Sequence, residues 1–137
     1  MRRAPQGPLP AWRLVVRTSL EPALDTVRRA MGRGGYRLVS LPGDLPLVFR
    51  RGSVASYALL GSHLTRYSGV RVTGTAVASG LVALTVLQDR AQHPVEAADA
   101  LETSVAAMVA EWSARGLLVT ADRQDDLPGA GDEEAAG

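Results

Sequence analysis

The stretch VRVTGTAVASGLVALTVLQ, residues 70–88, decides the fold. Its β-branched and apolar residues favour strands, and its Ser79-Gly80 pair is a typical turn between two of them. The stretch therefore predicts an antiparallel hairpin with strands at 70–77 and 81–88. Its uncharged part, 72–88, has 17 residues, fewer than the roughly 18 to 20 that a membrane-spanning helix needs. We therefore predict a hairpin here rather than a membrane span, and no membrane partner.

The segment before this hairpin predicts a strand, a helix and two further strands. Residues 12–18 alternate between apolar and polar side chains, as a half-buried strand does. A helix is predicted over 20–32, because a serine can cap its start and three glycines near its end can stop it. Its apolar residues recur at helical spacing, namely Leu20, Leu24, Val27 and Met31. Residues 36–41 and 46–51 predict two strands that pair through the turn at 42–44.

Residues 52–67 fit two patterns. Their apolar residues match a short helix capped by Ser53, and they also match the alternation of a strand. The helix is slightly favoured, and the strand remains open.

The segment after the hairpin predicts a long helix from Pro94 to Gly116. Glutamate and aspartate in its first turns complement the positive end of the helix dipole. Its apolar residues recur at steps of three and four and form one stripe of Ala98, Leu101, Val105, Met108 and Trp112. We expect Trp112 to be buried against the sheet. Residues 117–120 predict a short edge strand.

The predicted order is strand, helix, two strands, the ambiguous segment, two strands and a long helix. It indicates an α+β fold, a two-layer sandwich in which two helices cover one face of a mainly antiparallel sheet. The core domain is predicted at 11–121, between a flexible arm at 1–10 and a disordered acidic tail at 122–137. The order over about 12–115 resembles the TATA-binding-protein-like and helix-grip folds. That resemblance implies either a basic sheet face for nucleic acid or an apolar cavity beneath the C-terminal helix.

The charges are unevenly distributed along the chain. All 15 basic residues are arginine, and 13 of them lie in the first 90 residues, which hold only four acids. The remaining 47 residues hold ten acids and two arginines, so the formal net charge of +1 hides two oppositely charged parts. Codon usage in a GC-rich genome is the simplest explanation for arginine without lysine. The chain has no cysteine and no apolar leader, so we expect a cytoplasmic protein.

The sequence lacks the residue patterns that metal binding, phosphate-loop binding and nucleophilic catalysis require. His63 and His93 lie on different predicted elements without metal-ligand spacing, which argues against a metal site. Gly32, Gly34 and Gly35 follow a helix and precede a strand, the reverse of a phosphate-binding loop. Ser53 lacks the surroundings of a nucleophile elbow. We therefore predict no catalytic residue, no metal and no cofactor.

The arginines of the predicted strands recur on one side of the sheet. Because strand side chains alternate, five of them can share one face while apolar residues line the other. These five are Arg13, Arg17, Arg37, Arg50 and Arg71. The simpler interpretation is the solvated face of a sheet that is covered on one side only. The alternative is a face that binds an anion or a partner, because guanidinium groups recognise phosphate and carboxylate.

These observations favour a non-enzymatic binding domain for a partner protein or a small ligand. Its site would be the basic sheet face or a cavity beneath the C-terminal helix. An enzyme with an unrecognised pocket is the alternative. A nucleic-acid-binding module ranks third, because aromatic residues make up only 4% of the chain and single-strand binders stack bases on exposed rings.

Overall fold

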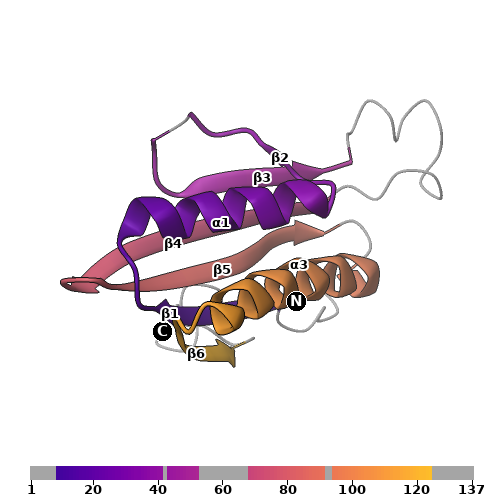
Figure 1. The fold of residues 1–137 in the computed structure, drawn as a ribbon. Helices are drawn as coiled ribbons and strands as arrows, with labels where there is room; N and C mark the ends of the chain where they lie inside the picture. The colour runs from indigo at the N-terminus through magenta and orange to yellow at the C-terminus, as the bar shows by residue number, and fades with distance from the viewer. Residues whose placement is uncertain (1–8, 42, 53–67, 92–93, 125–137) are drawn as a thin grey trace, which may run out of the picture.

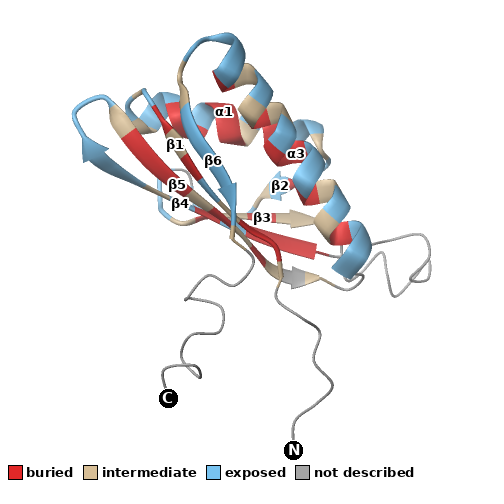
Figure 2. Ribbon diagram, turned by 90° about the horizontal axis from the view of Figure 1, so that it is seen from below, coloured by how far each residue is buried: buried red, intermediate tan, exposed pale blue. Residues whose placement is uncertain are grey.

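The structure is a computed structural model that describes residues 9–41, 43–52, 68–91 and 94–124. Within these residues, six strands form one sheet and two helices lie on one of its faces (Figures 1 and 2). The helices are α1 (Leu20–Arg33) and α3 (Pro94–Ala114). The strands are β1 (Ala11–Val16), β2 (Arg37–Leu38), β3 (Leu47–Arg51), β4 (Ser68–Ala78), β5 (Leu81–Ala91) and β6 (Leu118–Arg123). The predicted α+β class is confirmed.

The sheet has the strand order β2-β3-β4-β5-β1-β6, and every neighbouring pair is antiparallel. The predicted hairpin of β4 and β5 forms its centre. Each of its strands has 11 residues, and the pair turns through Ser79 and Gly80. The first strand of the chain adds to β5 and separates the central hairpin from β6. Strands that lie far apart in the sequence are therefore neighbours in space.

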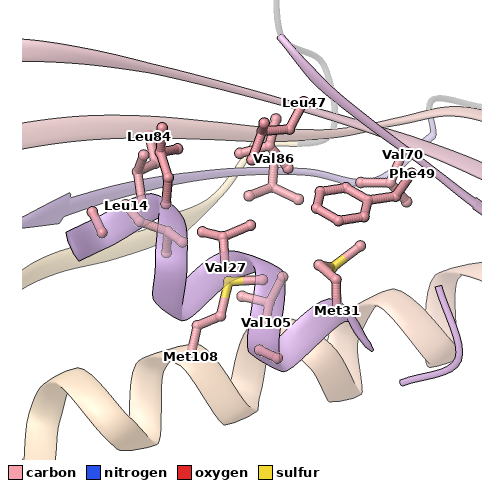
Figure 3. Packing of buried hydrophobic residues seen from close by; sticks show 14 of the residues in the cluster. Leu14, Val27, Met31, Leu47, Phe49, Val70, Leu84, Val86, Val105 and Met108 are labelled. Carbon is pink, nitrogen blue, oxygen red and sulfur yellow. The ribbon is translucent and has the colours of Figure 1, made fainter. Parts of the chain in front are cut away.

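The core lies between the sheet and the two helices. Leu14 and Val86 of the sheet meet Val27 of α1 and Val105 of α3, and all four are almost completely buried (Figure 3). The prediction that Trp112 is buried is confirmed, since only 1% of its surface is exposed. In the stripe of α3 the structure buries Ala97 rather than Ala98, so the stripe is rotated slightly at the start of the helix.

The end of α3 sets the position of β6. Gly116 has a φ of 70°, a left-handed conformation that glycine adopts without strain. The Leu117 amide donates a hydrogen bond to the Trp112 carbonyl, which turns the chain back along the sheet. β6 then pairs with β1 over six residues and is longer than the predicted edge strand at 117–120.

The expected strand at 36–41 is reduced to β2, which has two residues. Beyond it the ladder continues with one backbone bond, from the Val39 amide to the Val48 carbonyl. The Ser40 hydroxyl then accepts the bond from the Val48 amide, so a side chain replaces the main chain before the turn. The ambiguous segment, apart from Gly52, lies outside the described residues, as do both histidines and residues 125–137.

Candidate anion-binding face

One face of the sheet is not covered by either helix (Figure 2). Along β1 and the residue that follows it, the buried Leu14 and Val16 alternate with the exposed Arg13 and Arg17. The same alternation places the side chains of the other predicted arginines opposite the buried residues of their strands. All five lie on this face, which we call the open face: Arg13, Arg17, Arg37, Arg50 and Arg71.

Three of these arginines gather at one corner of the open face. Arg37 of β2 is directly opposite Arg50 of β3, and Arg71 of β4 is the diagonal neighbour of Arg50. Asp89 of β5 lies between two of them. Its carboxylate is 3.7 Å from Nη1 of Arg50 and 3.6 Å from Nη2 of Arg71. Arg37 instead donates a hydrogen bond from Nη2 to the Gly52 carbonyl. We call Arg37, Arg50, Arg71 and Asp89 the arginine corner.

Arg13 and Arg17 lie apart from the arginine corner. Arg13 belongs to β1 and Arg17 directly follows it, and β5 separates β1 from β4, so two strand spacings, roughly 10 Å, lie between β1 and Arg71. Arg71 is level with Ala11 through Leu87, so Arg17 lies still further away along the strand direction. Arg13 is opposite Thr85 on β5 and Asp122 on β6. Within the part of the chain that the structure describes, neither Arg13 nor Arg17 has an ion-pair partner. The sheet therefore divides the five arginines into two groups.

The open face differs from the helix-covered face in its aromatic content. Each aromatic side chain that the structure describes packs on the helix side of the sheet, namely Trp12, Tyr36, Phe49 and Trp112. The open face carries threonines and aliphatic residues between its arginines, such as Thr73, Ala83 and Leu87. A surface of this kind offers charge and hydrogen bonds to a ligand but no ring on which a base could stack.

A second polar group lies on the helix side. Burial raises the pKa of the Tyr36 phenol above its ordinary value of 10.0, and the positive charge of Arg51 and the nearby Ser68 hydroxyl oppose that rise. The Arg51 guanidinium lies 6.0 Å from the centre of the Tyr36 ring, and its Nε donates to the Gly34 carbonyl. Arg51 therefore packs against Tyr36 and Gly34 on the helix side of the sheet and does not belong to the open face.

Asp89 was not among the predicted site residues. In the sequence it is one acid at the end of a strand, and no local pattern connects it to residue 50 or 71. Only the pairing of three strands brings these groups together.

Among the described residues, no three carboxylate or imidazole groups gather as a metal site would require. No described helix is long and apolar enough to cross a membrane.

No protein-family model matches the chain, and no curated protein matches it. Among solved structures, it is similar to a chain in the crystal structure of the adenylate sensor from AMP-activated protein kinase in complex with 5-aminoimidazole-4-carboxamide 1-beta-D-ribofuranotide. The TM-score is 0.50 and the sequence identity is 17%, over 69% of this chain and 93% of the other. At that identity the likeness is one of fold, and fold alone does not determine function.

Proposed function

We propose that this protein is a non-enzymatic binding domain whose open face binds an anionic group of a partner protein or a small ligand. The observation that carries the proposal is the placement of five arginines on the face that no described helix covers. The acids on that face within the described residues are Asp89 and Asp122, so the arginines exceed them by three charges. Such an excess attracts anions, and the guanidinium groups supply donors to hold them.

The open face is a better candidate than a cavity beneath the C-terminal helix. Leu101, Val105, Met108 and Trp112 of α3 are all buried against the core, so apolar side chains occupy the space where such a ligand would lie. The lack of described aromatic side chains on the open face favours a small anion or an acidic protein segment over nucleic acid. The kinase adenylate sensor was solved with a nucleotide, which is a phosphate ester, and this makes nucleotides a sensible first class of ligands to test. We keep the prediction that the protein is cytoplasmic.

Binding to heparin at several salt concentrations tests the proposal. We expect the double variant Arg17→Ser and Arg71→Ser to bind heparin more weakly, with a salt dependence reduced by about two counterions. Exposed charges contribute little to stability, so the melting temperature should change little.

The matched control is the double variant Arg33→Ser and Arg115→Ser, which loses the same charge from exposed positions on the helix layer. Its heparin affinity should stay close to that of the unmodified protein. If both variants lose affinity equally, net charge alone governs binding and the proposal is wrong. Turnover of a substrate by the purified protein would favour the alternative of an enzyme.

A further inference from the structure

The arginine corner differs from the rest of the open face because its three arginines are neighbours and two of them form ion pairs with Asp89. We propose that it is a specific site for the phosphate group of a small phosphate monoester, held by Arg37, Arg50 and Arg71. This inference rests on the proposed function and names the ligand class and the residues. Asp89 and Gly69 hold the arginines in position and do not themselves bind the phosphate.

Gly69 provides the space in which the corner is built. It lies on β4 directly opposite Arg50, between β3 and β5. A Cβ atom at this position would lie 2.5 Å from Nη1 of Arg50 and 2.6 Å from Oδ1 of Asp89, closer than atoms can approach. The guanidinium and the carboxylate therefore meet over the backbone of a residue that has no side chain. Any other residue would push them apart.

A β-bulge directs Asp89 into this space. The pairing of β4 with β5 shifts between Gly69 and Val70, which face Arg90 and Gln88, so Asp89 is the extra residue of β5. A bulge changes the direction of a side chain and is frequent beside functional sites. Here the side chain of Gln88 is buried, whereas the carboxylate of Asp89 reaches two arginines on the open face.

Asp89 orients these arginines without using up their donors. Both ion pairs are longer than a hydrogen bond, and Oδ1 of Asp89 is buried with no hydrogen-bond donor among the residues that the structure describes. Each guanidinium carries five N–H groups. Within the described residues, one N–H group of Arg37 and one of Arg50 donate hydrogen bonds, both to backbone carbonyls. The Arg71 side chain is 51% exposed and can reach a ligand.

The charge balance of the corner selects the ligand. Three arginines and one aspartate carry a net charge of +2 and face the site from four adjacent strands. A phosphate monoester is a dianion at neutral pH, since its second pKa is about 6, and it neutralises this charge. A carboxylate would leave one positive charge uncompensated. A longer polyanion would also engage Arg13 and Arg17, which lie outside the corner.

Titration of the full chain with inorganic phosphate, followed by calorimetry and by the arginine Nε–H signals in NMR spectra, tests the site. We expect Arg37→Gln and Arg71→Gln each to weaken phosphate binding by at least about tenfold, because each removes a charged hydrogen-bonding group. Arg13→Gln is the matched control on the same face and should change the affinity by less than about twofold. Gly69→Ala should weaken binding like the arginine variants, and its melting temperature shows whether the sheet remains folded.

The pH dependence separates a dianion site from general charge attraction. Phosphate affinity should fall as the pH is lowered from about 7.5 to about 5, because the ligand gains a proton. Sulfate stays a dianion over this range, so its affinity should be nearly constant. If Arg13→Gln weakens phosphate binding as much as Arg71→Gln does, there is no specific corner site. Heparin binding that depends on Arg17 and Arg71, without phosphate binding, would overturn this inference alone, whereas loss of both behaviours would overturn the proposed function as well.

Discussion

Tyr36 is a single residue whose ionisation is linked to the stability of the whole fold. Its side chain is buried, and the Ser68 hydroxyl is a polar neighbour of its phenol. Burial raises its pKa above 10.0, so the folded state favours the neutral phenol. The stability that this preference contributes is fully present below pH 10 and is lost as the pH rises through the raised pKa. The chain has no lysine, so tyrosines are the main side chains that titrate between about pH 9 and 11.

We therefore predict that Tyr36→Phe makes the stability less sensitive to alkaline pH. The free energy of unfolding, measured in urea at steps between about pH 8 and 11, should decline less for the variant than for the unmodified protein. At neutral pH the free energies of unfolding should differ by about 1.5 kcal/mol or less, because the change removes at most one neutral contact, that of the phenol with the Ser68 hydroxyl. Two curves that stay parallel up to about pH 11 would show that Tyr36 ionises equally well in the folded state.

Trp112 is the largest fully buried side chain of the core. Trp112→Ala should lower the free energy of unfolding by about 3 to 5 kcal/mol, since it removes a large apolar side chain and leaves a cavity. Val95→Ala is the control on the same helix, because Val95 is 76% exposed, and it should change stability by about 0.5 kcal/mol or less. A loss of under about 1 kcal/mol at Trp112 would mean that the helix contributes little to the core.

At the scale of the elements, two glycines near helix ends have equal space for an added methyl group but differ in backbone conformation. Gly116, which follows α3, has a φ of 70°, whereas Gly32 lies within α1 with no atom within 4 Å of an added Cβ. Gly116→Ala should destabilise the protein by about 1 kcal/mol or more, because alanine is strained in the left-handed conformation. Gly32→Ala should instead stabilise it by roughly 0.5 to 1 kcal/mol, through the better helix propensity of alanine. Thermal unfolding of both variants checks this, and effects of the same sign would contradict it.

At the scale of the whole molecule, the C-terminal segment 125–137 and the open face carry opposite charges, and we predict that the segment weakens anion binding at that face. The acidic tail was predicted to begin at residue 122, but β6 continues to Arg123 and the Gln124 amide donates a hydrogen bond to the Ala11 carbonyl. A deletion that leaves the sheet intact therefore begins at residue 125. Deleting residues 125–137 removes five acids and no basic residue, which changes the formal net charge from +1 to +6. The segment contains one large apolar residue, Leu127, so we predict that the melting temperature changes by only a few degrees.

The same deletion should strengthen heparin binding, most clearly at low salt where charges act over longer distances. The control is a full-length variant in which the five acids are replaced by their amides, and it should bind like the truncated protein. Heparin affinity that is unchanged in both would show that the C-terminal acids do not act on the open face.

Much of the fold could be predicted from local patterns. A period of two located β1, and the strands of the central hairpin followed from the alternation and turn at residues 70–88. A period near 3.6 located both helices and the buried face of α3, including Trp112. The period of two along the strands placed all five arginines on the face opposite the core. These properties depend on neighbours within a few positions, so the sequence by itself determined them.

The arrangement of the arginines into two groups was decided only by the tertiary structure. Arg13 and Arg71 lie on the same face, as expected. Strand order places β5 between β4 and β1, however, so the two arginines are not neighbours. The bulge that directs Asp89 toward Arg50, and the space that Gly69 leaves for them, exist only where three strands pair in one register. Cross-strand contacts depend on which strands become neighbours, and burial of the whole core selects that order. A pattern within one segment therefore predicts which face a side chain occupies, but the pairing of distant segments determines which side chains meet there.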